Sequence, residues 1–332
     1  MSAPLLEVRN LRVEFPTRHG TLVALDDISF SIAPGEILGV VGESGAGKSL
    51  TGSAIIGLLD PPGRVAAGEI RFQGRRIDNL PYEQMRTVRG RHIGAIFQDP
   101  LTSLNPLYTI GRQLIETIQT HLHVSNHEAR QRAVHLLEET GIPAAAARID
   151  QFPHQFSGGM RQRVVIALAL AAEPQLIVAD EPTTALDVSI QAQIISLLKR
   201  LCKQHHAAVM LITHDMGVIA ETADRVAVMY AGRIVEIGPV ADVIHRPQHP
   251  YTQRLLGAFP QVGGVRALPP AIPGAPPDPA EPPSGCRFHP RCHLAREACS
   301  SGEMALRLVG DDHESACLFA PLTQPPIAGR VR

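Results

Sequence analysis

The sequence has no long hydrophobic run, no excess of charge of either sign and few cysteines, and each absence narrows the possible functions. No stretch approaches the ~18 apolar residues that a membrane-spanning helix requires, and the longest candidate, Val164 to Ala172, is typical of a buried helix. The formal net charge is -1, so no bulk basic field indicates nucleic acid. Glu7 and Arg9 stand where a secretory signal would need an apolar run. We therefore expect a cytosolic protein that serves a membrane only by docking.

What the chain does have is enough length and apolar content for a large core. It contains 332 residues, 44% of them hydrophobic and 19% charged, which is typical of a globular protein. Length suggests two domains. We place their boundary near residue 240, giving a domain at 1-240 and a C-terminal extension at 241-332. The extension includes the proline-rich stretch Phe259 to Gly285, whose prolines disfavour helix and strand.

The first domain has the periodicity of an α/β fold. Leu5 to Phe30 alternates apolar and polar residues, as half-buried antiparallel strands do. Ile37 to Val41 is continuously apolar, which suits a strand covered on both faces, and a glycine loop and a helix-compatible stretch follow it. Residues 110–140 have helical spacing, and two more helix–strand pairs are predicted at 158–179 and 190–213. These alternating units predict a mostly parallel sheet with helices on both faces.

The glycine loop matches the pattern G-x-x-x-x-G-K-[ST]. Its residues are Gly42, Glu43, Ser44, Gly45, Ala46, Gly47, Lys48 and Ser49. Such glycines let backbone N–H groups face a phosphate at the positive end of the following helix. Lys48 would reach the β- and γ-phosphates, and Ser49 would ligate Mg²⁺. A chance glycine turn is the alternative, but the strand before the loop and the helix after it favour a nucleotide site.

Two carboxylates, Asp180 and Glu181, follow the predicted strand Leu176 to Ala179. The carboxyl end of a strand in a parallel sheet opens onto the ligand crevice. Asp180 is placed there to hold Mg²⁺ through its water shell, and Glu181 to act as the general base for the attacking water. The alternative is an acidic helix N-cap. The glycine loop elsewhere in the chain favours the catalytic interpretation.

A second helix start suited to anions begins at Ser157, where the serine can cap the helix and Gly158 and Gly159 allow a phosphate to approach. This segment resembles the signature loop of the ABC transporter ATPases, usually written LSGGQ, with Phe156 and Met160 replacing its first and last residues. The resemblance covers about residues 5 to 240. It implies a P-loop NTPase core with an antiparallel β subdomain and a helical subdomain at about 100-160.

The resemblance also implies roles for residues that are weak signals on their own. Gln98 matches the Q-loop glutamine that contacts Mg²⁺ and the attacking water, and His214 matches the switch histidine that contacts the γ-phosphate. Asp187, in Ala185-Leu186-Asp187, matches the D-loop at the dimer seam, and Phe15 matches the aromatic residue that stacks on adenine. Singly, such a histidine is more often a loop residue and such a phenylalanine core. Their order along the chain supports the assigned roles.

The implied mechanism needs a head-to-tail pair of ATPase subunits. ATP on Gly42 to Ser49 of one subunit is closed over by Ser157 and Gly159 of the other, and hydrolysis lets the pair reopen. The segment Asp99 to Pro106 would face the membrane subunits. The implied partners are two transmembrane permease subunits, a second ABC ATPase that is more often a paralogue than an identical copy, and indirectly an extracytoplasmic solute-binding protein.

Further segments resemble the ATPases of dipeptide and oligopeptide importers: Gln98 to Pro106, Pro153 to Arg163, His249 to Thr252 and the cysteine-bearing tail. The expected function is ATP hydrolysis that energises peptide import from the cytoplasmic face of the membrane. Because the ATPase does not touch the solute, a nickel, glutathione or other small-solute importer of the same family is the alternative. A soluble ABC ATPase serving translation or DNA repair is disfavoured, since the chain lacks a second cassette, coiled-coil arms and a basic groove.

Four of the five cysteines lie in the C-terminal extension with the spacing C-x5-C-x6-C-x17-C. They are Cys286, Cys292, Cys299 and Cys317. In a reducing compartment such thiolates favour metal over disulfides, and four soft ligands suit an iron–sulfur cluster (4Fe-4S) or zinc. The spacing lacks the C-x-x-C pairs of common zinc sites, and His289, His293 and His313 could substitute as ligands. We expect a cluster, with zinc or unmetallated thiols as alternatives, and a core position for Cys202.

Overall fold

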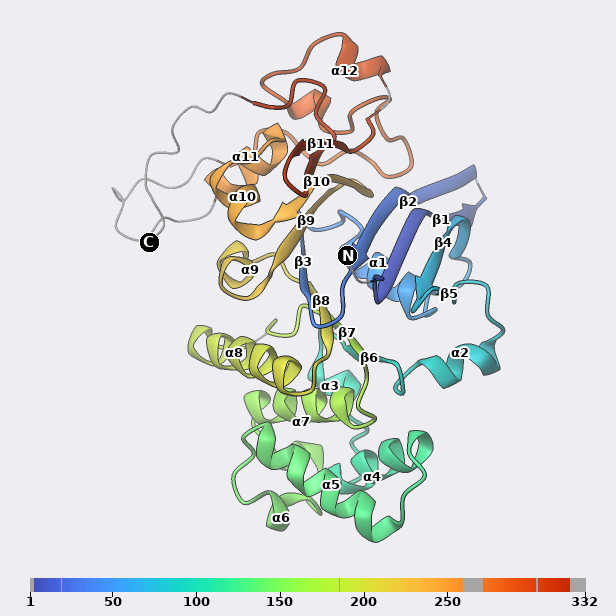
Figure 1. Ribbon diagram of the computed structural model, residues 1–332, viewed down its shortest axis with the longest axis vertical. Helices are drawn as coiled ribbons and strands as arrows, with labels where there is room; N and C mark the ends of the chain where they lie inside the picture. The colour runs from blue at the N-terminus through green and yellow to red at the C-terminus, as the bar shows by residue number, and fades with distance from the viewer. Residues whose placement is uncertain (1–2, 19, 185, 259–270, 303, 323–332) are drawn as a thin grey trace.

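The fold consists of two β-sheets flanked by a helical region at one end and the C-terminal region at the other (Figure 1). The structure is a computed structural model that describes residues 3–18, 20–184, 186–258, 271–302 and 304–322. It confirms the predicted mixture of a largely parallel sheet, an antiparallel β subdomain and a helical subdomain. None of the described helices is long and apolar enough to cross a membrane.

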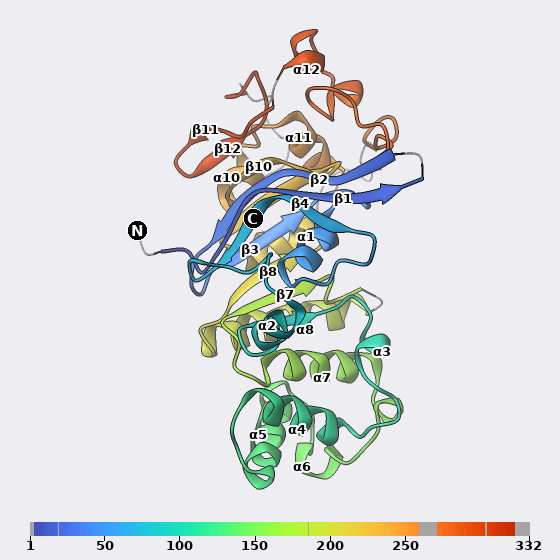
Figure 2. The ribbon, with the colours of Figure 1, turned by 90° about the vertical axis from the view of Figure 1, so that its right-hand side faces the viewer.

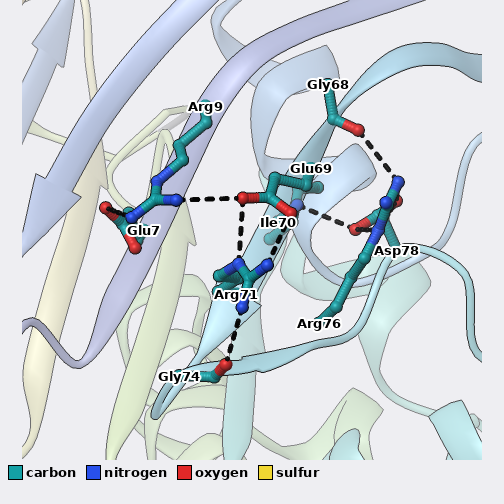
Figure 3. Close-up of polar contacts among 9 residues, drawn as sticks. All are labelled: Glu7, Arg9, Gly68, Glu69, Ile70, Arg71, Gly74, Arg76 and Asp78. Atoms are coloured by element: carbon teal, nitrogen blue, oxygen red, sulfur yellow. Dashed lines mark hydrogen bonds and ion pairs between the residues drawn. The ribbon is translucent and has the colours of Figure 1, made fainter.

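The antiparallel sheet forms from the N-terminal segment, as its period-two pattern predicts. Its strands are β1 (Leu6–Thr17), β2 (Gly20–Ile32), β4 (Arg64–Phe72) and β5 (Arg75–Arg76), in the order β2-β1-β4-β5. Leu6, Val8 and Val13 of β1 are buried. Charged residues occupy exposed positions of the same strands, where Glu69 pairs with both Arg9 and Arg71 (Figure 3). The sheet therefore presents one apolar face to the core and a polar face to solvent.

The larger sheet holds the strands that were predicted to be buried on both faces. Among the described residues it has eight strands in the order β11-β12-β10-β9-β3-β8-β7-β6. Their bounds are β3 (Ile37–Val41), β6 (Ile93–Ile96), β7 (Leu176–Asp180), β8 (Ala208–Ile212), β9 (Arg225–Tyr230), β10 (Arg233–Pro239), β11 (Arg307–Gly310) and β12 (His313–Ser315). The pairs β3–β8, β3–β9, β6–β7 and β7–β8 are parallel, and the remaining pairs are antiparallel.

Two hydrophobic cores lie on opposite faces of this sheet. Alternate residues of β7 point to each, because successive side chains of a strand face opposite sides. Leu176 and Val178 belong to the core shared with the antiparallel sheet, α1 (Lys48–Ile55) and α2 (Tyr82–Val88), and Ile177 and Ala179 to the core on the other face. The antiparallel sheet and α1 lie together in Figure 2. Helices α7 (Gly158–Leu170), α8 (Val188–Gln204) and α9 (Met216–Thr222) border this second core, as do helices of the helical region and of the C-terminal region.

The helical region spans much of the predicted 100-160 subdomain. Its elements are α3 (Pro100–Ser103), α4 (Ile110–His121), α5 (Asn126–Glu139), α6 (Ala145–Arg148) and η1 (Pro153–Gln155), with α2 (Tyr82–Val88) preceding them. The helical pattern predicted at 110–140 forms two helices. The break comes at Ser125, whose side chain accepts a hydrogen bond from the Glu128 N–H and so caps α5.

The C-terminal region continues the main sheet. Its helices are α10 (Val240–His245), α11 (Pro250–Gly257), η2 (His289–Arg291) and α12 (Ala298–Ser301). Strand β12 pairs with β10, and its His313 hydrogen-bonds to the fully buried Glu236 of β10 at 2.8 Å. Phe288 packs in the same core as the sheet. The division near residue 240 stays a prediction, and the first part of the proline-rich stretch, 259–270, lies outside the described residues.

Close packing of β6 on α7 gives a test of the fold. A Cβ added to Gly94 would lie 2.5 Å from the backbone oxygen of Ala169. We expect Gly94→Ala to lower the free energy of unfolding by about 1–3 kcal/mol, because backbone cannot yield to relieve the clash. Gly257→Ala is the control, since nothing lies within 4 Å of its added Cβ. Urea denaturation measures both, and equal stabilities of the two variants would contradict the described packing.

Candidate active site

The phosphate loop, residues 42–49, connects β3 to α1 as the glycine pattern predicts. Gly47 has a φ of 99°, a left-handed conformation that favours glycine. A Cβ on Gly42 would lie 2.2 Å from the backbone oxygen of Met229. The loop can therefore follow this path only with glycine at both positions, and the path brings it to the N-terminus of α1.

Lys48 is buried within the loop. Its side chain is 6% exposed, and Nζ donates hydrogen bonds to the backbone oxygens of Gly42 (2.9 Å) and Glu43 (3.1 Å). Burial lowers the pKa of the Lys48 ammonium, although the charges of Glu181 and Asp180 act in the opposite direction. An ammonium with these neighbours can exchange the loop's carbonyl oxygens for phosphate oxygens.

Ser49 and Asp180 come together across the sheet edge. The Ser49 hydroxyl donates a hydrogen bond to Asp180 Oδ1 at 2.9 Å. Burial raises the pKa of Asp180, while the hydrogen bond from Ser49 and the charge of Lys48 oppose that rise. A hydroxyl and a carboxylate oxygen in contact at the start of a helix are the hard oxygen donors that Mg²⁺ prefers.

Glu181 is the centre of a hydrogen-bond network. Its carboxylate accepts hydrogen bonds from Gln98 Nε2 (3.0 Å) and Thr184 Oγ1 (2.8 Å), and lies 3.3 Å from His214 Nδ1. Burial raises its pKa, but the hydrogen bonds from Thr184 and His214 and the charges of His214 and Lys48 outweigh burial, so the pKa is lowered. Glu181 also has a left-handed backbone with φ 45°, which is rare for a residue with a side chain.

The strand order explains why these residues meet. Gln98 follows β6, Asp180 ends β7, Glu181 follows it, and His214 follows β8. Strands β6, β7 and β8 are parallel neighbours, so their carboxyl ends lie at one edge beside the loop that follows β3. An ionised carboxylate held by three neighbouring side chains can orient a water molecule and accept its proton.

Thr184 is a site residue that the sequence reasoning missed. Its hydroxyl donates to Glu181, and its backbone N–H donates to the Glu181 carbonyl at 3.1 Å, which closes a turn after β7. The only signal for it in the sequence is a hydroxyl residue three positions after the carboxylate, a spacing too common to single it out.

The predicted signature segment starts a helix, but not beside the phosphate loop of the same chain. Ser157 is the N-cap of α7, as predicted, with its Oγ accepting from the Met160 N–H at 3.4 Å. Ser157 and Gly158 are exposed, and among the described contacts neither reaches residues 42–49. Phe156 is buried in the core, so the departure from leucine keeps an apolar anchor. Asp187 is the exposed N-cap residue of α8, and Ala185 lies outside the described residues.

Phe15 lies on β1, half-buried, against Gly63. A cavity of about 200 Å³ borders the phosphate loop at Glu43 to Ala46, with Val23 and Ala24 of β2 on one side and Pro276 to Pro282 of the C-terminal region on another. Phe15 does not line this cavity. Its predicted role in stacking on adenine therefore stays a prediction.

The four C-terminal cysteines line one small cavity. Cys286, Cys292, Cys299 and Cys317 line it, together with His249 and His289. Burial raises the pKa of the Cys286 thiol to about 11. Among the described residues, no three cysteine, histidine or acidic side chains are close enough to hold a single metal ion.

The histidines predicted as alternative ligands, and the fifth cysteine, lie in different surroundings. His313 does not line the cavity, and its Nε2 hydrogen-bonds to Glu236 Oε1, so its predicted role as an alternative ligand stays a prediction. His293 does not line the cavity, whereas His289 does. Cys202 is buried in the core, as predicted, and burial raises its pKa to about 12.

Taken together, a glycine phosphate loop, a serine–aspartate pair and a networked glutamate at the edge of a parallel sheet define a P-loop ATPase. Comparison with known proteins agrees. Residues 25–184 match the family model described as ABC transporter, and residues 235–299 match that of the oligopeptide/dipeptide transporter, C-terminal region.

Curated relatives align along nearly the whole chain. The dipeptide transport ATP-binding protein DppD of Escherichia coli (strain K12) is 46% identical over 95% of this chain and 96% of its own length. The oligopeptide transport ATP-binding protein OppD of Bacillus subtilis (strain 168) is 49% identical over 99% of this chain and 93% of its own. The chain belongs to the ABC transporter ATPases, in the branch of the dipeptide and oligopeptide transport ATP-binding proteins.

Solved structures with the same fold are also ABC cassettes. The dimeric structure of MJ0796, a bacterial ABC transporter cassette, has a TM-score of 0.64 at 28% identity, covering 71% of this chain and 98% of that one. CbiO1 from Clostridium perfringens, part of the ABC transporter complex cbiONQ, has a TM-score of 0.62 at 29% identity, covering 73% and 91%. The predicted P-loop NTPase fold is thus confirmed.

The Thr184 contact can be tested by comparing Thr184→Val with Thr184→Ser. We expect valine to lower kcat for ATP hydrolysis about tenfold, because a hydrogen bond to a charged group contributes about 1.5–3 kcal/mol. Serine keeps the hydroxyl and should retain most activity. The affinity for ATP should be unchanged in both variants. Equal kcat values for valine and serine would show that the Thr184 hydroxyl does not position Glu181.

Proposed function

We propose that this ATPase energises the import of dipeptides or oligopeptides. The observation that carries its chemical part is the meeting of Lys48, Ser49, Asp180 and Glu181 at one edge of the parallel sheet. The choice of peptide is supported by the names of the relatives, which transport dipeptides or oligopeptides, and by the match of residues 235–299 to the oligopeptide/dipeptide transporter C-terminal region.

In the proposed mechanism the chain's own residues bind, orient and move a proton. The loop N–H groups and Lys48 would bind the β- and γ-phosphates of ATP. Ser49, Asp180 and Gln98 would hold Mg²⁺, which supplies positive charge against the phosphates when bound. Glu181 would orient the attacking water and take its proton. His214, whose side chain is 68% exposed, could reach the γ-phosphate while remaining beside Glu181.

A second ATPase subunit is needed to complete the proposed site. Ser157, Gly158 and Gly159 begin a 13-residue helix whose free N–H groups suit an anion, yet Ser157 and Gly158 are exposed. We infer that this helix start, which lies beside Leu186 in the segment that holds Asp187, closes over the nucleotide of a partner subunit, which we propose is a paralogue. The dimeric form of the similar cassette MJ0796 supports this arrangement.

The proposed membrane partners would dock on the surface after β6. A cavity of about 390 Å³ lies between β6, α3 and α7 and is lined in part by Phe97 and Leu168. Leu101 is 61% exposed and Leu107 is 79% exposed, so apolar side chains project from the segment that follows β6. Two permease subunits contacting this surface would place the ATPase at the cytoplasmic face of the membrane, with a solute-binding protein acting on the other side.

We also propose that the four C-terminal cysteines hold an iron–sulfur cluster. The four cysteines line one cavity, and soft thiolates are the ligands of 4Fe-4S clusters. A tetrahedral zinc ion, with Zn–S distances of ~2.3 Å, would draw the sulfurs within about 3.8 Å of one another. The four cysteines would each hold a different iron of such a cluster, which suits thiols around a cavity that do not converge on one point. Zinc remains the alternative occupant.

Changing Glu181 to glutamine tests the catalytic assignment. Glu181→Gln should bind ATP normally but lose about 100-fold or more in turnover, because glutamine cannot accept the proton. Glu173→Gln is a matched control, since Glu173 also has a left-handed backbone (φ 54°) but pairs with Arg132. Steady-state ATPase assays and a fluorescent ATP analogue report the two quantities. Normal turnover in Glu181→Gln would remove Glu181 as the base.

Metal analysis tests the cysteine proposal. Protein purified without oxygen should contain iron and absorb broadly in the visible region, and Cys292→Ser should lower both. Cys202→Ser is the control, because Cys202 is buried in the core and does not line the cavity. Zinc alone, at about one ion per chain, would overturn the cluster assignment.

A further inference from the structure

The C-terminal region holds the second residue of the phosphate loop, Glu43. The guanidinium of Arg291 pairs with its carboxylate through two contacts, Nη1 to Oε2 at 2.7 Å and Nη2 to Oε1 at 3.1 Å. The hydroxyl of Tyr251 accepts a hydrogen bond from the Glu43 backbone N–H at 2.9 Å. Both the side chain and the main chain of Glu43 are therefore fixed by residues more than 200 positions away in sequence.

The Arg291–Glu43 pair is geometrically constrained, with a buried guanidinium and a half-buried carboxylate. The Arg291 side chain is 5% exposed and that of Glu43 is 26% exposed. Arg291 also donates hydrogen bonds to the hydroxyl of Tyr230 and to the backbone oxygen of Pro273. Bidentate pairs between arginine and a carboxylate are among the stronger hydrogen-bonded contacts, and removing one partner from a buried pair leaves a costly unpaired charge. Arg291 is thus locked in place and can hold Glu43 in turn.

Glu43 links this C-terminal anchor to the phosphate-binding lysine. Its backbone oxygen accepts a hydrogen bond from Lys48 Nζ. When Lys48 turns toward a phosphate, that contact and the one to Gly42 are lost. The contacts from Arg291 and Tyr251 do not involve Lys48, so they can keep the loop in its wound conformation. A loop held in shape before its ligand arrives loses less conformational freedom on binding.

We propose that Arg291 and Tyr251 are positioning residues for ATP binding, through which the C-terminal region pre-organises the phosphate loop. This inference rests on the proposed nucleotide role of that loop. It is supported by the cavity beside Glu43 to Ala46, one wall of which is formed by Pro276 to Pro282 of the same region. The C-terminal region then forms part of the nucleotide site in addition to extending the cassette.

The test is a double-mutant cycle on the full chain, read out as the affinity for a fluorescent ATP analogue. Arg291→Met and Glu43→Gln should each raise Kd about tenfold, and the double variant should be no weaker than either single variant, because both remove the same contact. For Arg291→Met at saturating ATP, kcat should stay within about threefold of wild type, so the loss appears in KM. The Kd of Arg291→Lys should lie between those of wild type and Arg291→Met, since lysine keeps the charge but not the bidentate geometry.

A matched control separates positioning from a purely structural role. Arg130 makes a bidentate pair with Asp150 in the helical region that has the same contact pattern but is exposed, and Arg130→Met should leave Kd unchanged. If Arg291→Met lowers the melting temperature but not the affinity for nucleotide, Arg291 only anchors the C-terminal region and the proposal is wrong. Additive losses in the double variant would overturn it as well.

Two further variants keep the test decisive. If Arg291→Met does not fold, Glu43→Gln, which changes only the loop side of the pair, decides the question: unchanged Kd overturns the proposal and a raised Kd supports it. Lys48→Ala distinguishes the two levels of inference. Loss of binding in Lys48→Ala with normal binding in Glu43→Gln rejects the positioning role alone, whereas normal binding in Lys48→Ala rejects the nucleotide role of the loop itself.

Discussion

The parallel pairing of β6, β7, β8 and β3 is the constraint on which the site depends. Because these strands run the same way, their carboxyl ends meet at one edge. A functional residue or loop stands at or just after the end of each strand. Each strand is buried on both faces, between two cores, so the edge is rigid. Glu181 can keep a left-handed backbone there because the turn closed by Thr184 and the bonds to its carboxylate hold it.

The C-terminal region packs on this core through a strand and a group of aromatic side chains. Strand β12 extends the main sheet through β10, and the rings of Phe288, Tyr230 and Tyr251 pack against one another. Tyr251 of that aromatic group and the neighbouring Arg291 both contact Glu43 of the phosphate loop. The cavity lined by the cysteines includes His249 and Cys292, each within two residues of those loop contacts. The nucleotide loop and the cysteine cavity are therefore close neighbours through one packed unit.

Much of the fold and part of the site followed from local sequence patterns. The continuous apolar residues of β3, the glycines of the phosphate loop and the capping serine of α7 act within a few residues of one another, so their structures are readable directly. The helical stretch at 110–140 was recognised, but its division into α4 and α5 depends on the cap at Ser125. The pairing of β12 with β10 left no signal, because a three-residue strand has no periodicity to detect.

What the sequence determined by itself is the chemistry: a phosphate loop, two carboxylates after a buried strand, four clustered cysteines and membership of a recognisable ATPase family. Only the tertiary structure decided which side chains share a site. Thr184 beside Glu181, the cysteines around one cavity, and Arg291 against Glu43 all depend on where separate elements pack. Arg291 and Glu43 lie 248 positions apart, and no local preference encodes such a contact, because it exists only once both cores and the sheet between them have formed.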